Sequence, residues 1–217
     1  MSLSQKIDAE CAQMRLRFHD DEAKFSWLPM LLDAYAIIDK GTTTAIKGEE
    51  DRRNAKLFCK KGCDNCCRTH KDIPVYPLEL VGIYWYCAEK IDRHVRETLK
   101  KQLLNHGNEM HCPFLINSSC LIYPIRPVSC RQFNVFNKPC DAGEDPYYTR
   151  RDDVLTPAQD YTNQAFLVML PFYGITDEAE KLKAIKNNFI HTQVCNLQSY
   201  KWTGLIKAMK DFDSKIR

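Results

Sequence analysis

The sequence predicts a mainly α-helical domain in which helices surround a short β-hairpin and a cysteine-rich metal centre. Apolar residues recur every three or four positions near both ends of the chain, as at Cys11, Met14 and Phe18, and this is the helical period. Nine of the eleven cysteines lie between Cys59 and Cys140. A chain of 217 residues that is 44% hydrophobic can bury an ordinary core, so a metal would add to a fold that other contacts stabilise.

We expect one domain made of three segments. Residues 1–57 form an N-terminal helical flank, residues 58–140 form a cysteine-cluster metal-binding core, and residues 141–217 form a C-terminal helical flank that packs on the same domain. In the first flank, apolar spacing predicts one helix around Cys11 and a second that begins near Trp27 and ends near Gly41. We expect a turn from Gly41 to Gly48 and a short charged helix over residues 49–58.

The middle segment combines short elements. Residues 59–67 form a turn-rich loop, and residues 73–76 form an extended piece because Pro74 and Pro77 disfavour helix before them. Pro77 then suits the first turn of a helix, and residues 93–105 have the pattern of a basic amphipathic helix.

The second half of the middle segment predicts a hairpin. Two extended runs, residues 112–116 and 120–123, flank a turn at Asn117, Ser118 and Ser119. A helical turn is expected over residues 126–133 and a surface loop over residues 141–156. Three helices then follow, over residues 156–170, 177–191 and 198–216.

The number and setting of the cysteines point to reduced thiols. Eleven is an odd number, and residues 1–13 lack the apolar core of a secretory signal, which favours metal-binding or redox thiols over a disulfide framework. The longest apolar stretch, residues 166–175, contains Pro171 and is shorter than the roughly 20 residues that a membrane span needs. We therefore expect a soluble cytoplasmic protein that does not enter a membrane.

Eight cysteines are candidate metal ligands. Thiolates are soft ligands that select zinc, copper(I) or iron-sulfur clusters, and these eight would fill two four-cysteine sites or one site with spare thiols. Neighbouring side chains in an extended segment point to opposite sides, so the adjacent pair Cys66 and Cys67 would serve different centres, or only one of them would bind. Cys11, Cys87 and Cys195 stand alone among apolar or helical residues and are expected to be core residues. The eight candidates are Cys59, Cys63, Cys66, Cys67, Cys112, Cys120, Cys130 and Cys140.

These cysteines also carry a family resemblance. The run Cys59-x3-Cys63-x2-Cys66-Cys67 is followed by the motifs Cys112-Pro-Phe-Leu, Cys120-Leu-Ile-Tyr and Arg126-Pro-x-x-Cys130-Arg. With them the chain resembles, over about residues 58–140, the YkgJ-type cysteine-cluster family, the CxxCxxCC domain described as zinc- or iron-chelating. The resemblance implies metal binding through all the cysteines of these motifs, with Cys140 as a further member.

A related branch is similar to the flagellin lysine N-methylases. These are larger proteins that carry a similar cysteine cluster and transfer methyl groups from S-adenosylmethionine to lysine side chains. The resemblance implies S-adenosylmethionine as a cofactor to test, but it supplies no catalytic residue. The triplet Cys59, Cys63 and Cys66 also has the three-then-two spacing of radical S-adenosylmethionine enzymes. We interpret that spacing as a coincidence, because Asn65 stands where that family has an aromatic residue and the chain has too few strands for a β/α barrel.

Several neighbours of the cysteines are candidates for supporting roles. Arg126 and Arg131 could donate hydrogen bonds to cluster sulfurs or to an anionic ligand, and a surface salt bridge or a structural clamp is the alternative. Tyr123 could donate a proton or close the core over the metal, and we favour the core role. His70 and His111 adjoin cysteines, so either could replace a thiolate as a ligand.

Three functions remain open. We favour an iron-sulfur protein with a redox or methyl-transfer role, in which a 4Fe-4S cluster binds Cys59, Cys63, Cys66 or Cys67, and Cys130, because thiols outnumber histidines. The second is a zinc-binding structural or interaction module without catalysis. The third, a metal-free switch between Cys66 and Cys67, is the weakest because a disulfide between adjacent residues closes a strained ring. The expected partner is a redox protein or a protein substrate, and the evenly spread net charge of +3 disfavours nucleic acid.

Overall fold

The computed structural model describes residues 9–60, 62–107 and 111–215, and it confirms the predicted mainly helical fold. Two small antiparallel sheets accompany the helices: β1 (Pro74–Val75) pairs with β4 (Cys195–Asn196), and β2 (Leu115–Ile116) pairs with β3 (Ser119–Cys120). A π-helical turn over Tyr86–Lys90 extends α5. The α-helices in the described ranges are α1 (Ala9–Met14), α2 (His19–Glu22), α3 (Trp27–Arg53), α4 (Asn65–Thr69), α5 (Pro77–Trp85), α6 (Arg93–Asn105), α7 (Val128–Gln132), α8 (Pro146–Thr149), α9 (Gln159–Met169), α10 (Glu178–Lys186) and α11 (Thr203–Lys215).

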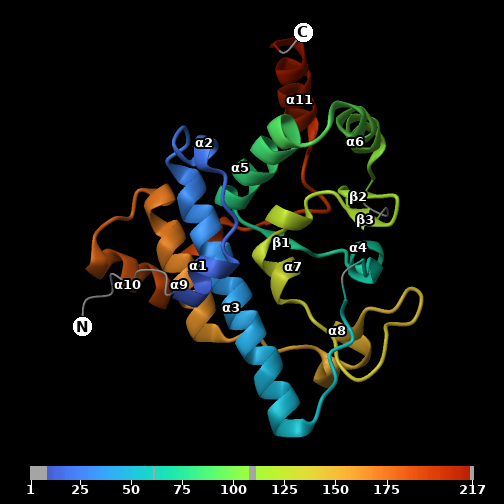
Figure 1. The fold of residues 1–217 in the computed structure, drawn as a ribbon, viewed down its shortest axis with the longest axis vertical. Coiled ribbons are helices and arrows are strands. Elements are labelled where there is room, and N and C mark those ends of the chain that lie inside the picture. Colours follow the sequence, from blue (N-terminus) through green and yellow to red (C-terminus); the bar gives the residue numbers. More distant parts are fainter. Residues whose placement is uncertain (1–8, 61, 108–110, 216–217) are drawn as a thin grey trace.

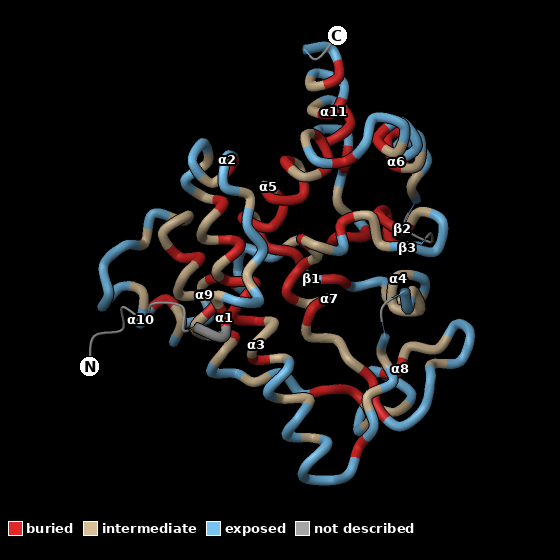
Figure 2. Tube along the Cα trace, viewed as in Figure 1, coloured by how far each residue is buried: buried red, intermediate tan, exposed pale blue. Residues whose placement is uncertain are grey.

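The long helix α3 forms the centre of the fold. Its buried face carries apolar side chains with no exposed surface, among them Leu28, Leu31 and Ile38. Helix α9 packs along α3, and α1, α5 and α7 also contact it (Figure 1). Figure 2 shows that buried residues gather where these helices meet, whereas the far end of α3 is mostly exposed. The hydrophobic core thus takes residues from both flanks and from the middle segment.

The expected turn between Gly41 and Gly48 is wrong, because α3 continues through both glycines. Gly41 allows a close approach of α9: a Cβ at this position would overlap the Cβ of Tyr161. A Cβ at Gly48 would meet no atom within 4 Å. The helix ends instead at Asn54, which caps it in the left-handed conformation with φ 52°. Packing against a neighbouring helix therefore explains the first glycine, and residues 49–53 belong to α3 rather than to a separate helix.

A buried ion cluster fastens α6 to α11. Asp213 accepts hydrogen bonds from Arg96 at 2.6 Å and from Lys100 at 2.7 Å. Arg96 also donates to the carbonyl oxygens of Ala88 and Ile91 at 2.8 and 2.7 Å, at the end of the π-helical turn. Burying a charge is costly unless it is paired, so this network allows three charged side chains to lie in the interior. Helix α6 has the bounds that the amphipathic pattern predicted.

The hairpin of β2 and β3 is confirmed. Its turn residues Asn117 and Ser118 both have positive φ, 50° and 58°, which the tight two-residue hairpin turn requires. The register pairs Leu115 with Cys120, so the hairpin presents Cys120 at a defined place. The other sheet was not predicted beyond its first strand, because Val75 pairs with Cys195, far away in the sequence.

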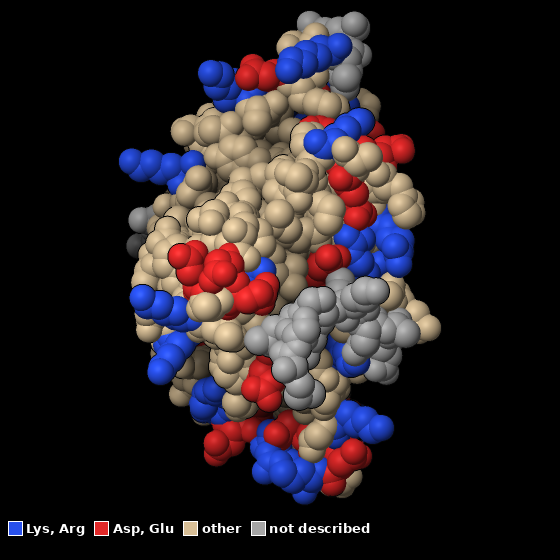
Figure 3. All heavy atoms as spheres, turned by 90° about the vertical axis from the view of Figure 1, so that its left-hand side faces the viewer, with Lys and Arg blue, Asp and Glu red and all other residues tan. Residues whose placement is uncertain are grey.

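The three C-terminal helices are present as α9, α10 and α11, and the expected loop over residues 141–156 contains the short helix α8. On the side of the molecule that carries α9 and α10, positive and negative side chains are interspersed (Figure 3). Within the described ranges, none of the helices combines the length and the apolar character that crossing a bilayer would need.

The two glycines of α3 make a matched pair for a stability test. We expect Gly41→Ala to lower the free energy of unfolding by about 1–3 kcal/mol, because the added methyl overpacks the contact with Tyr161. Gly48→Ala should raise it by about 0.5–1 kcal/mol, because alanine is the better helix former and has free space there. Urea denaturation of both variants measures this. Equal effects at the two positions would contradict the packing explanation.

Candidate metal centre

Seven of the eight predicted ligand cysteines line one cavity of about 690 Å³. They come from four separate parts of the middle segment: the loop before α4, α4 itself, the hairpin and α7. Figure 1 shows α4, the hairpin, α7 and α8 grouped on one side of α3. The fold therefore brings together cysteines that are up to 71 positions apart in the sequence (130 − 59). The seven are Cys59, Cys63, Cys66, Cys67, Cys112, Cys120 and Cys130.

Backbone and side-chain hydrogen bonds hold α4 in place. The N–H of Cys112 donates to the carbonyl oxygen of Cys67 at 2.7 Å, which joins the hairpin to α4. The side chain of Asn65 donates to the carbonyl oxygen of Glu144 at 2.9 Å, which joins α4 to the segment before α8. Gly62 precedes the helix with φ 87°, a conformation that favours glycine. These contacts fix Cys66 and Cys67 between the hairpin and the 141–153 segment.

Helix α7, which carries Cys130, is anchored to the core by Glu79. This carboxylate has no exposed surface and accepts the backbone N–H of Val128 at 2.7 Å and that of Tyr76 at 2.9 Å. The first bond holds the start of α7 and the second caps α5. Burial raises the pKa of Glu79 to about 7, although the two N–H groups and the charge of Arg131 act in the opposite direction.

Four thiols form an inner group: Cys67, Cys112, Cys120 and Cys130. The thiol of Cys67 lies within hydrogen-bonding reach of those of Cys112 and Cys120. These two neighbours lower the pKa of Cys67, and their hydrogen bonds to it, together with burial, raise their own pKa values. Cys130 interacts electrostatically with Cys67, and burial raises its pKa to about 12. One thiolate, at Cys67, is thus favoured among protonated neighbours.

The other four candidates form an outer group: Cys59, Cys63, Cys66 and Cys140. The backbone N–H of Val135 donates to the sulfur of Cys59 at 3.2 Å, and burial raises the pKa of that thiol. Cys59 interacts electrostatically with Cys63 and Cys140, and among the thiols that act on Cys66 it is the strongest. Cys140 does not line the cavity, but its sulfur accepts a hydrogen bond from Arg150 at 3.7 Å.

The adjacent pair Cys66 and Cys67 is helical rather than extended, so the geometric reason expected for its divergence is wrong. Consecutive residues on a helix are about 100° apart around the axis, because 3.6 residues complete a turn. The two side chains therefore diverge without pointing to opposite sides. Cys67 interacts with Cys112 and Cys120, whereas among the thiols Cys66 interacts most strongly with Cys59 of the outer group. That they serve different centres stays a prediction.

The cysteines around the cavity do not form a compact coordination sphere in the described part of the chain. Among the residues that the structure describes, no three His, Cys, Asp or Glu side chains are close enough together to hold one metal ion. The chemistry of the donor set nevertheless fits zinc or an iron-sulfur cluster, since both groups consist of thiols. Closing either group would need cysteine side chains to change rotamer.

Comparison with known families agrees with this chemistry. Residues 58–160 match the family CxxCxxCC, described as a "putative zinc- or iron-chelating domain". No curated protein and no solved structure matches the chain. The similarity to flagellin lysine N-methylases therefore stays a prediction, and the cysteine cluster is of a type that is described as chelating zinc or iron.

The match to the family extends past residue 140, where the sequence motifs ended, and the structure gives a reason. Arg150 reaches back to the outer group and is held there by Glu144 at 2.9 Å and Asp153 at 3.1 Å. Its side chain also donates to the carbonyl oxygens of Phe136, Lys138 and Pro139. The segment around α8 is therefore part of the wall of the site.

The two predicted arginines have different surroundings. Arg131 is the structural clamp: its three nitrogens donate to Asp39 at 2.6 Å, to the carbonyl oxygen of Arg126 at 2.9 Å and to that of Pro124 at 2.5 Å. Its guanidinium also lies 3.9 Å from the ring centroid of Tyr35 on α3. Arg126 lines the cavity and interacts with Cys130. The core role expected for Tyr123 is wrong, because this residue is 45% exposed at the cavity wall.

The two candidate histidines, His70 and His111, also have different surroundings. His70 lines the cavity, and its Nδ1 lies 3.4 Å from Asp145 and 3.2 Å from the hydroxyl of Thr69. His111 is exposed and does not line the cavity. Cys11 and Cys87 are buried in the core as predicted, and Cys195 is partly buried on β4, outside the cavity lining.

Three residues of the site escaped prediction from the sequence: Glu79, Asp145 and Arg150. Glu79 carried one weak signal, since a glutamate three residues after a helix N-cap forms a capping box, but Tyr76 stands where serine or threonine is usual. Asp145 and Arg150 lie in a segment that reads as a loop, and no local spacing links either of them to a cysteine.

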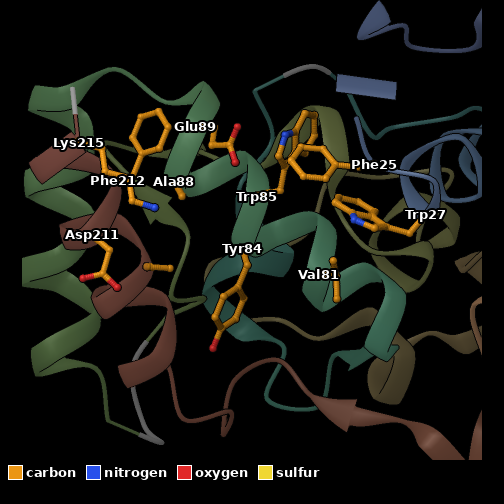
Figure 4. Close-up of a pocket in the computed structure, with 11 residues that line it drawn as sticks. Phe25, Trp27, Val81, Tyr84, Trp85, Ala88, Glu89, Asp211, Phe212 and Lys215 are labelled. Atoms are coloured by element: carbon orange, nitrogen blue, oxygen red, sulfur yellow. The ribbon is translucent and has the colours of Figure 1, made fainter. Parts of the chain in front are cut away.

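A second hollow, of about 420 Å³, lies away from the cysteines between α5 and α11. Figure 4 shows its aromatic lining, with Phe25, Trp27, Tyr84, Trp85 and Phe212 around it. It contains no cysteine or histidine, so it offers no soft metal ligands.

The buried carboxyl of Glu79 predicts a pH-dependent stability. Its pKa in the folded state, about 7, is above the ordinary value of 4.5, so the folded protein holds this proton more tightly than the unfolded chain does. The contribution of this group to stability is therefore present below about pH 4.5 and is lost as the pH rises to about 7. The variant Glu79→Gln has no titratable group at this position, so its stability lacks this dependence on pH.

We expect Glu79→Gln to destabilise the protein by about 1–3 kcal/mol at pH 5, because one N–H is left without its acceptor, and by less at pH 8. Urea denaturation of wild type and variant under reducing conditions at both pH values measures the difference. A deficit that grows from pH 5 to pH 8 would contradict the raised pKa.

Proposed function

We propose that the CxxCxxCC domain binds metal in two four-cysteine centres, the inner group and the outer group, and that these hold iron-sulfur clusters of the 4Fe-4S type. The observation that carries this proposal is the gathering of seven cysteines from four separate parts of the chain around one cavity, where Cys67 interacts with Cys112 and Cys120. Four cysteines match the ligand number of one cluster. This grouping replaces the set Cys59, Cys63, Cys66 or Cys67, and Cys130 that the sequence suggested.

The all-thiol composition of both groups supports iron-sulfur ahead of zinc. Structural zinc sites commonly include histidine, and neither group contains one. The histidine that lines this cavity, His70, contacts Asp145 and Thr69 through Nδ1, and its buried Nε2 has no partner among the described residues, so a mixed site that includes His70 belongs to the zinc alternative. Zinc remains the alternative: four thiolates also suit a tetrahedral zinc ion that would tie α4, the hairpin and α7 together without catalysis. The family description includes both metals.

A bound cluster would supply electron transfer or activate a bound molecule, and the residues around it would tune it. The N–H of Val135 at Cys59 and the guanidinium of Arg150 at Cys140 stabilise negative charge on those sulfurs. The cavity leaves room beside the inner group for a small molecule, which supports S-adenosylmethionine-related methyl transfer as a role to test. A redox protein or a protein substrate is the partner that either role would need.

The metal itself is decided by one measurement. We expect protein purified without oxygen to be brown, with a broad visible absorption and with iron and sulfide in equal amounts. Absorption spectroscopy with iron, zinc and sulfide analysis tests this. A colourless protein that contains one or two zinc ions would contradict the iron-sulfur proposal and establish the zinc module, because zinc has a filled d shell.

The grouping is tested by single substitutions. Cys130→Ser should remove the inner centre and Cys63→Ser the outer one, so each variant should hold about half of the wild-type metal and the double variant should hold none. Cys195→Ser is the matched control, because Cys195 lies outside the cavity lining and should leave the metal content unchanged. Metal analysis of wild type and the four variants measures this. Full metal content in both single variants would sink the ligand assignment.

A further inference from the structure

The two arginines of the motif Arg126-Pro-x-x-Cys130-Arg131 differ in how many of their donors are used. All three nitrogens of Arg131 donate to protein acceptors, and Asp39 balances its charge at 2.6 Å. Arg126 makes one hydrogen bond, from Nη1 to the carbonyl oxygen of Tyr123 at 3.2 Å. Within the described residues, no carboxylate forms an ion pair with Arg126. A guanidinium has five N–H donors, so Arg126 keeps donors that the protein does not use.

The position of Arg126 is nevertheless restricted. Its guanidinium lies 4.0 Å from the ring centroid of Tyr123, a cation–π contact that holds the planar group against the ring. The residue is partly buried and lines the cavity, and its charge acts on the thiol of Cys130. The unused donors thus belong to a fixed group beside the inner cysteines rather than to a mobile surface side chain.

Apart from the cysteines, the charged side chains that line the cavity favour a negative ligand. Two carboxylates line it, and both are engaged: Asp72 accepts from Asn196 at 3.0 Å, and Asp145 caps α8 through the N–H of Tyr147 at 3.0 Å and faces His70. Lys60 and Lys71 add two exposed positive charges.

Part of the remaining wall is apolar and suits an organic body. Ile73, Ile122 and Leu197 are buried side chains that line the cavity. A volume of about 690 Å³ lies within the range of small-molecule sites, about 300–1,000 Å³. A ligand that combines a carboxylate with an apolar ring or chain would satisfy both parts of the lining.

We propose that Arg126, held by Tyr123, binds the carboxylate of a small organic acid whose apolar body lies along Ile73, Ile122 and Leu197. This inference rests on the proposed function, because it places that ligand beside the inner metal centre. Planar guanidinium groups bind carboxylates through two parallel hydrogen bonds, and the free edge of Arg126 offers that geometry.

The test compares benzoate with its neutral isostere benzamide. Both are titrated by calorimetry into the reduced full chain, purified without oxygen with the metal that it holds. We expect wild type to bind benzoate about tenfold or more tightly than benzamide, from the strength of hydrogen bonds between charged groups. Arg126→Gln should make the two affinities equal, and Arg126→Lys should leave an intermediate preference because it keeps the charge but not the planar fork.

Arg151→Gln is the matched control. Arg151 also lies over an exposed tyrosine, 5.0 Å from the ring centroid of Tyr147, but it does not line the cavity, so the preference for benzoate should survive. Circular dichroism and metal content, measured on the same samples, show whether each variant folds and is loaded.

Two results would overturn the proposal. In the first, wild type does not bind benzoate or does not bind it more tightly than benzamide. In the second, Arg126→Gln keeps the wild-type preference for benzoate. A metal-free wild type that still prefers benzoate through Arg126 would refute the proposed function while leaving the anion site in place. A metal-loaded protein that does not prefer benzoate would refute the anion site and leave the proposed function in place.

Discussion

The buried carboxylate of Glu79 is the contact on which the site depends. It is fully enclosed, and it accepts one backbone N–H at the start of α5 and one at the start of α7. Because a buried carboxylate without partners is costly, both helices are held at a fixed distance from each other. Arg131 continues the connection from α7 to Asp39 on α3. Through these two side chains the Cys130 helix is tied to the core rather than left on a loop.

The rest of the cysteine cluster is arranged around that anchor by short elements. The hairpin carries Cys120, and the bond from Cys112 to Cys67 fixes α4 against it. Short elements bury little apolar surface of their own, so their positions depend on hydrogen bonds to neighbours and on the core beneath them. The main hydrophobic core includes Cys112 and has Cys67, Cys120 and Cys130 packed against it, so the inner group borders the core directly.

Burial gives the thiols a common character. It raises the pKa of Cys59, Cys66 and Cys130, so these groups hold their protons at neutral pH until a metal displaces them. Cys67 is the exception, because two neighbouring thiols donate to it. Cys67 lies on α4, where it interacts with the thiols of Cys112 and Cys120.

The sequence by itself determined the helical class, the bounds of the amphipathic helix α6, the hairpin and the set of cysteines that share the cavity. These follow from local spacing, which periodicity, turn residues and motifs record directly. Tertiary structure alone decided the rest. The sequence around Gly41 predicts a turn, and only the contact with Tyr161 of α9 explains a glycine inside the helix. Arg126 and Arg131 belong to the same motif, and only the ion pair between Arg131 and Asp39 distinguishes them. The division of the cysteines likewise depends on which thiol meets which across the cavity, and contacts between distant residues leave no pattern in neighbouring positions.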